Sequence, residues 1–183
     1  FTRPDSGATF VSYPAPTFSA LRGMFDSVAW LRTAYMRPMA VEICRPIQFL
    51  RYSTNYGGPL RKADQVKTGS SYQLFATVLV DVCYRVHGEV RAREEALGTH
   101  DDLRYLQVKF NRRLKHGGLY RTPSLGWSEF TPSYFGPLRT STRSQESMNI
   151  EIPSMLHTVF DQESRGILEP RFRQGVRIEK GVL

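Results

Sequence analysis

The chain has 183 residues, the size of one domain or of one domain with an appendage, which is long enough to bury a hydrophobic core. Lysine and arginine number 25 against 17 acidic residues, so the formal net charge of +8 favours an anionic partner. Two cysteines, Cys44 and Cys83, are too few for a disulfide framework, and we find no signal peptide or apolar run of membrane-spanning length, so we expect a cytoplasmic protein with no membrane partner.

Aromatic residues make up 12% of the chain and are interleaved with basic residues. This combination suits single-stranded RNA, because bases stack on aromatic rings while arginine and lysine contact phosphates. A basic protein with an ordinary aromatic core is the alternative that the composition leaves open. The sequence has no CxxC pair, HxxxH spacing, nucleophile elbow or phosphate-binding glycine motif, so we predict neither a metal site nor a cofactor.

The first predicted helix follows a proline-rich turn in residues 12–30, which read SYPAPTFSALRGMFDSVAW. Thr17 is a suitable N-cap residue, because its hydroxyl can accept a hydrogen bond from a backbone N–H of the first turn. The apolar residues recur at spacings of three, four and three, which places them on one face: Phe18, Leu21, Phe25 and Val28. Arg22 projects away from that face, so the pattern predicts a helix packed on a sheet with a basic residue near its start.

The middle of the chain is rich in strand signals. Residues 39–52 are rich in Val, Ile, Phe and Tyr, and residues 76–90 alternate apolar and polar side chains. Between them, residues 56–71 (YGGPLRKADQVKTGSS) form a predicted polar loop that is rich in glycine and lacks a hydrophobic period. This loop carries three cations: Arg61, Lys62 and Lys67.

A second helix is predicted over residues 102–116, and Gly117 after it is a C-cap signal. One face is apolar and consists of Leu103, Leu106, Phe110 and Leu114. The other face is basic and consists of Arg104, Lys109, Arg112, Arg113 and Lys115. Such a face contacts either RNA phosphates or solvent, and the pattern leaves both open.

The C-terminal third predicts short strands with turns at Pro132 and Gly136, and a polar loop over residues 138–149. A terminal hairpin over residues 169–182 would turn near Gln174–Gly175. Two helices among several strands predict a ferredoxin-like α+β fold with an antiparallel sheet.

Five segments, taken in order, carry a resemblance to a known family. They are residues 1–4 (FTRP), the helix segment 12–30, residues 45–49 (RPIQF), residues 125–130 (LGWSEF) and residues 155–161 (MLHTVFD). Together they resemble the Cas-five family, the subunit of type I CRISPR Cascade complexes that holds the five-prime end of CRISPR RNA, and are most similar to its subtype I-C form.

The resemblance implies an RRM-like domain over residues 1–122, with a basic thumb hairpin near 56–71, and a β-rich portion with a small sheet over 123–183. The implied partners are CRISPR RNA and the backbone and large subunits of Cascade, with target DNA contacted indirectly. Trp127, within LGWSEF, either packs in the core or stacks on a base. The RNA-binding candidates are Arg22, Arg61, Lys62, Lys67, Arg104, Lys109, Arg112, Arg113, Lys115 and Trp127.

The subtype I-C resemblance also implies metal-independent cutting of the CRISPR repeat by a Tyr, a Lys and a His. The Tyr position falls on Ala29, and counting back from Gly117 puts the Lys–His pair on Tyr105 and Leu106. Other candidates are His100, in an acidic turn, and Lys115–His116, at the far end of the helix. We therefore predict RNA binding without cleavage. A repeat-processing endoribonuclease and a basic protein–protein adaptor are the alternatives.

Overall fold

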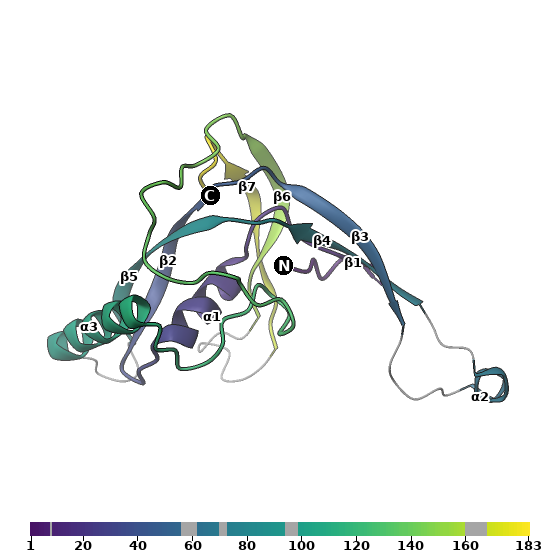
Figure 1. Cartoon of the computed structure of the whole chain (residues 1–183), viewed down its shortest axis with the longest axis horizontal. Coiled ribbons are helices and arrows are strands. Elements are labelled where there is room, and N and C mark those ends of the chain that lie inside the picture. Colours follow the sequence, from purple (N-terminus) through teal and green to yellow (C-terminus); the bar gives the residue numbers. More distant parts are fainter. Residues whose placement is uncertain (8, 56–61, 70–72, 94–98, 160–167) are drawn as a thin grey trace.

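The computed structural model describes residues 1–7, 9–55, 62–69, 73–93, 99–159 and 168–183, and it has the expected α+β class. Figure 1 shows the elements in chain order. They are β1 (Phe10–Val11), α1 (Phe18–Val28), β2 (Ala34–Ile43), β3 (Gln48–Asn55), α2 (Ala63–Thr68), β4 (Gln73–Val80), β5 (Tyr84–Ala92), α3 (His100–His116), β6 (Ile150–Thr158) and β7 (Arg171–Ile178).

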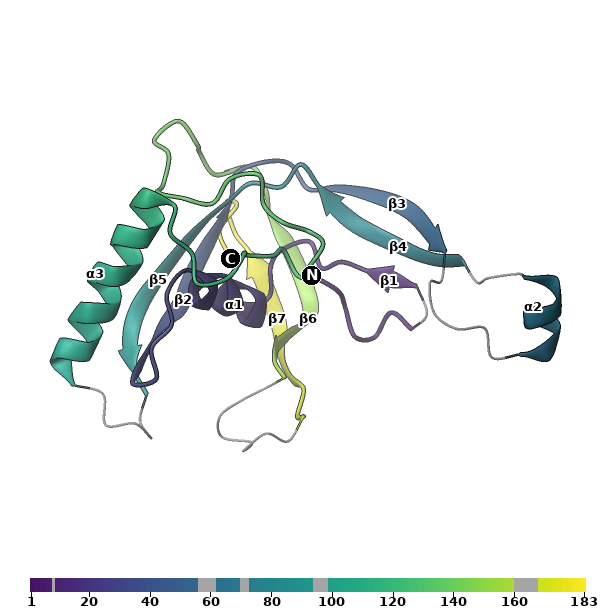
Figure 2. The same cartoon turned by 60° about the horizontal axis from the view of Figure 1, so that its bottom comes forward.

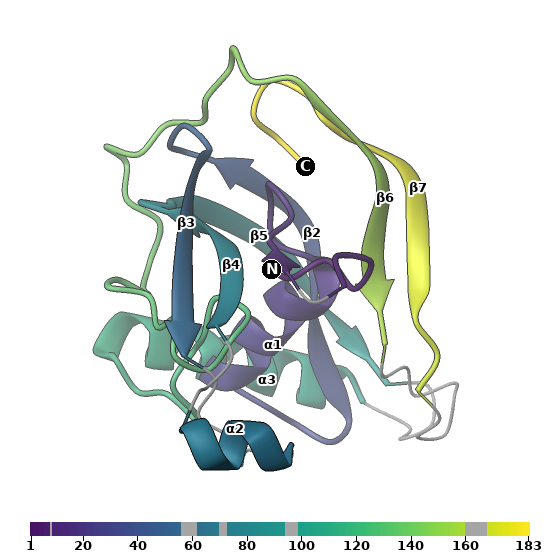
Figure 3. The ribbon, with the colours of Figure 1, turned by 90° about the vertical axis from the view of Figure 1, so that its right-hand side faces the viewer.

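The strands are distributed over three sheets rather than one continuous sheet. β2 pairs antiparallel with β5, β6 pairs antiparallel with β7, and the β3–β4 hairpin adds β1 in parallel on β4. Figure 2 shows the β3–β4 hairpin extending away from α3, with α2 at its far end. Figure 3 shows α1 between this hairpin and the β6–β7 pair.

The C-terminal tail adds a further partner to β2. Val41 and Leu183 exchange backbone hydrogen bonds of 2.9 Å, and the Ile43 N–H donates to the Gly181 carbonyl at 2.8 Å. The tail follows β7 directly, so these bonds tie the β6–β7 pair to the β2–β5 sheet.

The main core lies where α1 and α3 pack on the β2–β5 sheet. The rings of Phe25 in α1 and Phe110 in α3 meet edge to face, with centroids 5.6 Å apart. The buried members of this cluster are Phe25, Val28, Ala29, Ala34, Met36, Leu106 and Phe110. A second cluster, around Tyr13, Ile43 and Ile178, connects β6–β7 to the rest of the chain.

Both long helices were predicted correctly in type and position. The Thr17 hydroxyl accepts a hydrogen bond from the Ala20 N–H at 3.3 Å, as its N-cap role predicts. α3 begins at His100 rather than at 102, because Thr99 and Asp102 form a reciprocal capping box. Gly117 ends this helix with a φ of 74°, in the left-handed region that glycine favours.

Three predictions from local patterns were wrong. The predicted loop at 56–71 contains α2, a helix too short to give a hydrophobic period. The terminal hairpin is absent, because β7 runs continuously through Gly175 and pairs with β6 instead of with itself. The expected short strands after α3 are also absent, since residues 117–149, all described, form neither helix nor strand. The domain division near residue 122 stays a prediction.

The close packing of α1 on β5 predicts the effect of one substitution. A Cβ atom at Gly88 would lie 2.6 Å from Cε2 of Phe25 and 2.9 Å from the Arg37 carbonyl oxygen. Gly88→Ala should therefore lower the free energy of unfolding by about 1–3 kcal/mol in urea denaturation. Gly23→Ala, in α1 with open space around it, is the control and should raise it by about 0.5–1 kcal/mol. Equal stability of Gly88→Ala and wild type would contradict this packing.

Candidate nucleic-acid interface

A groove with a volume of about 960 Å³ runs over the exposed side of α1. α1 and the turn after it contribute one wall, and the segment that follows α3 contributes another. We call it the α1 groove. Its charged side chains are Arg22, Asp26 and Arg121, and its aromatic side chains are Phe1, Phe18, Trp30, Tyr120 and Trp127. The side chains of Trp30, Tyr120 and Arg121 are exposed, so rings and guanidinium groups are presented together to solvent.

The carboxyl end of α1 holds these walls together. The backbone N–H groups of Tyr120 and Arg121 both donate to the Ser27 carbonyl, at 2.8 and 2.9 Å. Nη1 of Arg113 donates to the Val28 carbonyl at 2.8 Å. Carbonyls at a helix C-terminus have no partner within the helix, and a cation there also complements the helix dipole. These bonds fix the position of residues 120–121 beside α1.

Arg22 belongs to a small charged cluster at the side of the α1 groove. Its guanidinium carbon lies 4.7 Å from the ring centroid of Tyr35 in β2, and that of Arg93, just after β5, lies 5.3 Å from the same centroid. Burial, and then the charge of Arg22, lower the pKa of Arg93. Burial raises the pKa of Asp26, although the charges of Arg22 and Arg93 oppose this rise.

The side chains of the basic face of α3 differ in how exposed they are. Arg104, Arg112 and Lys115 are exposed, as an anion-binding face requires. Lys109 is half-buried and lies over the Tyr105 ring, with its Nζ 5.3 Å from the centroid. Arg113 is half-buried and bonded to α1, so its guanidinium supports the fold, and its contact with RNA stays a prediction.

The remaining binding candidates lie apart from the α1 groove or are engaged in packing. Lys62 and Lys67 are exposed at α2, at the end of the hairpin, and Arg61 lies outside the described residues. The Trp127 ring stacks on Phe130 and meets Phe10 edge to face, with centroids 5.7 and 5.1 Å apart. Trp127 thus has the packing role that its sequence context allowed, and its contact with RNA stays a prediction.

The structure does not bring the catalytic candidates together. His100 and His116 are the first and last residues of α3, about 24 Å apart along the helix axis at 1.5 Å per residue. Tyr105 is 55% exposed, whereas Leu106 and Ala29 are 0% and 1% exposed and share one apolar cluster. Buried apolar side chains therefore occupy the two positions implied for Tyr and His.

Sequence reasoning missed five residues of this region as binding candidates: Trp30, Tyr35, Arg93, Tyr120 and Arg121. Local signals at these positions are ordinary, and only the tertiary contacts bring them to α1. Across the described residues, no group of three or more His, Cys, Asp or Glu side chains is placed to hold a metal. No helix in the described part of the chain is long and apolar enough to cross a membrane.

No family model matches the chain. Two proteins with similar sequences carry the same name. The chain is 31% identical to the CRISPR pre-crRNA endoribonuclease Cas5d of Thermus thermophilus, over 98% of this chain and 76% of the relative. It is 27% identical to the protein of the same name from Mannheimia succiniciproducens, over 87% of this chain and 79% of the relative.

Solved structures agree in fold. The crystal structure of a CRISPR-associated protein superposes with a TM-score of 0.70, at 19% identity, over 94% of this chain and 80% of the other. A functionally uncharacterized protein from Streptococcus mutans superposes with a TM-score of 0.67, at 20% identity, over all of this chain and 84% of the other.

Two neighbouring arginines in α3 should differ in what they contribute to stability. Arg113→Ala removes a charge-assisted hydrogen bond to the Val28 carbonyl and should lower the free energy of unfolding by about 1.5–3 kcal/mol. Arg112→Ala, on the exposed side, is the matched control and should change it by less than about 0.5 kcal/mol. Equal effects of the two substitutions in urea denaturation would show that Arg113 does not anchor α1.

Proposed function

The chain belongs to the Cas5d family of CRISPR-associated proteins, and we propose that it is the CRISPR RNA-binding subunit of a type I Cascade surveillance complex. In this role it holds the five-prime handle of the RNA and caps the filament of backbone subunits. Both curated relatives are named for an action on pre-crRNA, which makes CRISPR RNA the expected ligand of a protein with this fold.

The α1 groove is the observation that carries the proposal. It combines the guanidinium groups of Arg22 and Arg121 with the exposed rings of Trp30 and Tyr120. Unstacked bases of single-stranded RNA stack on such rings, and their phosphates accept hydrogen bonds from arginine. Arg104, Arg112 and Lys115 on α3 are exposed and add positive charge to the helix that Arg113 bonds to the end of α1.

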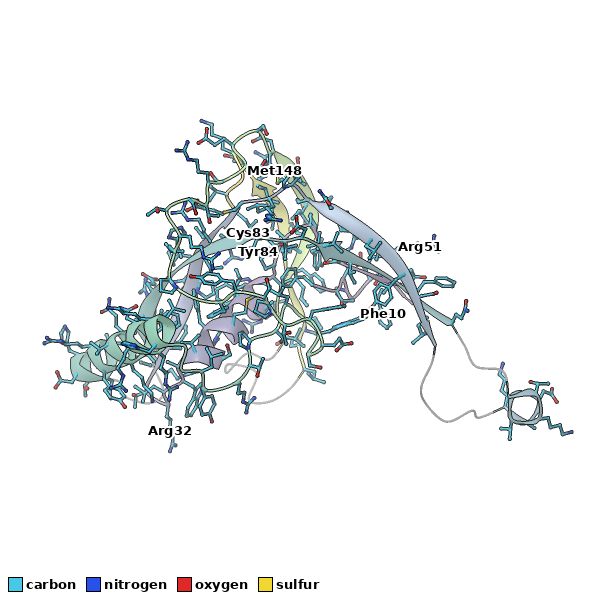
Figure 4. The ribbon with its side chains drawn as sticks, viewed as in Figure 1. Phe10, Arg32, Arg51, Cys83, Tyr84 and Met148 are labelled. Carbon is cyan, nitrogen blue, oxygen red and sulfur yellow. The ribbon has the colours of Figure 1, made fainter. Side chains whose placement is uncertain are left out.

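Contacts with other subunits would use the β3–β4 hairpin. Large apolar side chains are exposed along the hairpin and at α2: Phe49, Leu50, Val66 and Phe75. Arg51, labelled in Figure 4, lies on β3 with its guanidinium over the Phe75 ring at 5.2 Å. Exposed apolar clusters of this kind mark protein–protein contact surfaces. The backbone and large subunits of Cascade are the proposed partners, with target DNA contacted indirectly.

Cleavage of pre-crRNA is a second candidate, because both relatives are named endoribonucleases. Metal-independent cleavage needs a base or acid at the 2′-OH and the leaving oxygen, and a cation at the phosphorane. Here the implied Tyr and His positions are the buried Ala29 and Leu106, which offer no proton-transferring group. We therefore propose that this chain binds CRISPR RNA without cutting it.

Binding of the handle can be measured directly. The purified protein should bind its own repeat-derived five-prime tag more tightly than a scrambled RNA of equal length. The logarithm of the affinity should fall linearly with the logarithm of salt concentration, with a slope of about −0.7 per neutralised phosphate. Equal affinity for both RNAs would show non-specific binding by a basic protein and would contradict recognition of the handle. Affinity that does not change with salt would favour the protein–protein adaptor.

Cleavage has its own test. Labelled repeat RNA incubated with pure protein in EDTA should stay intact, because loss of one acid or base costs roughly 10²–10⁴ in rate. Single substitutions Ala29→Tyr and Leu106→His should not restore cutting, since both side chains would enter a closed core and destabilise it. One specific cut by the wild-type protein would overturn the binding-only proposal, and His100→Ala and His116→Ala would then locate the histidine responsible.

A further inference from the structure

Arg93 is a buried cation that forms no ion pair among the described residues. It follows β5, where its backbone N–H donates to the Thr33 carbonyl at 2.9 Å, and its side chain leaves the residue only 8% exposed. Its Nε is buried and has no hydrogen-bond partner. Among the described residues, no carboxylate forms an ion pair with it. Buried charges and buried donors in native proteins are almost always paired, so this exception requires an explanation.

The surroundings of Arg93 add positive charge rather than remove it. Arg22 and Arg93 both lie against the ring of Tyr35, which holds the two guanidinium groups in one cluster. The carboxylate of Asp26 acts on both arginines, but it forms an ion pair with neither. Among the described residues, this cluster holds two cations and one carboxylate in a partly buried site. Like charges in such a site repel one another strongly unless an anion joins them.

The cluster opens on the α1 groove through Arg22. Arg22 is half-buried and lines the groove together with Asp26 and Trp30, while Arg93 does not line it but lies over the same Tyr35 ring as Arg22. An anion in the groove can therefore contact Arg22 directly, and the charge of Arg93 attracts the same anion from nearby. Guanidinium groups match the oxygens of a phosphate with two parallel N–H donors.

We propose that Arg22, Tyr35 and Arg93 form a binding site for one phosphodiester group of the RNA backbone. The proposal rests on the proposed RNA-binding function and identifies where on the chain one phosphate is held. Arg22 contacts the phosphate, and Arg93 is a positioning residue that supplies the second charge. A phosphodiester carries a single negative charge, which attracts both guanidinium groups.

The test separates binding from stability. Arg93→Met keeps the length and apolar stem of the side chain but removes the charge. It should weaken handle binding about tenfold or more and reduce the salt slope by about 0.7, while the melting temperature stays equal or rises. Arg22→Gln should weaken binding similarly. The matched control is Arg91→Met, two residues earlier in β5 but exposed and paired with Glu89 at 2.7 Å, which should bind within twofold of wild type.

Other outcomes overturn the site. If Arg93→Met binds RNA as well as wild type and melts at a lower temperature, Arg93 has only a structural role against Tyr35. If wild type binds no RNA, the proposed function fails, and inorganic phosphate becomes the probe. Stabilisation of wild type by phosphate over chloride at equal ionic strength, lost in Arg93→Met, would then support a phosphate site alone. No such stabilisation would reject it.

Discussion

The hydrogen bonds at the carboxyl end of α1 determine where α3 and residues 120–121 lie relative to the α1 groove. A helix ends with carbonyls that lack partners, and here Arg113 of α3 and the N–H groups of residues 120–121 supply donors to Val28 and Ser27. The same few bonds fasten α3 to α1 and lead the chain after α3 along the groove. Without them, Tyr120 and Arg121 would belong to a loop with no fixed relation to Arg22.

The same junction accommodates apolar residues at two positions where the family resemblance implies a Tyr and a His. Ala29 is the C-cap of α1, with its N–H bonded to the Phe25 carbonyl, and it packs in one cluster with Leu106 of α3. Two apolar side chains meet there without any need for polar partners. A tyrosine and a histidine in those positions would each need hydrogen-bond partners or access to water. Apolar contact therefore strengthens the α1–α3 junction where relatives are implied to place reactive groups.

The helices were predictable because their signals are local. The period of apolar residues, the Thr17 cap and the Gly117 stop each depend on residues within one or two turns. The pairing of β7 with β6, the C-terminal tail on β2 and the burial of Arg93 depend on residues far apart in sequence. Arg112 and Arg113 are chemically identical neighbours, and only the position of Val28, 85 residues away from Arg113, makes one structural and leaves the other exposed.

Ion pairs neutralise much of the positive charge on the β2–β5 sheet. On β2 and β5, Glu42 holds Arg85 at 3.0 Å and His87 at 2.6 Å, while Glu89 holds Arg91 at 2.7 Å. Arg45 is paired with Asp81 at the ends of the neighbouring strands. In the described part of the chain, the ion pairs involve neither Arg22, Arg112 and Arg121, on or beside the two long helices, nor Arg51, Arg173 and Arg177 on β3 and β7. Acidic residues thus neutralise cations mainly on the β2–β5 sheet, and cations remain on the helices and on the other two strand pairs. Of these remaining cations, Arg22 and Arg121 line the α1 groove, so they act on an anion in the groove at short range.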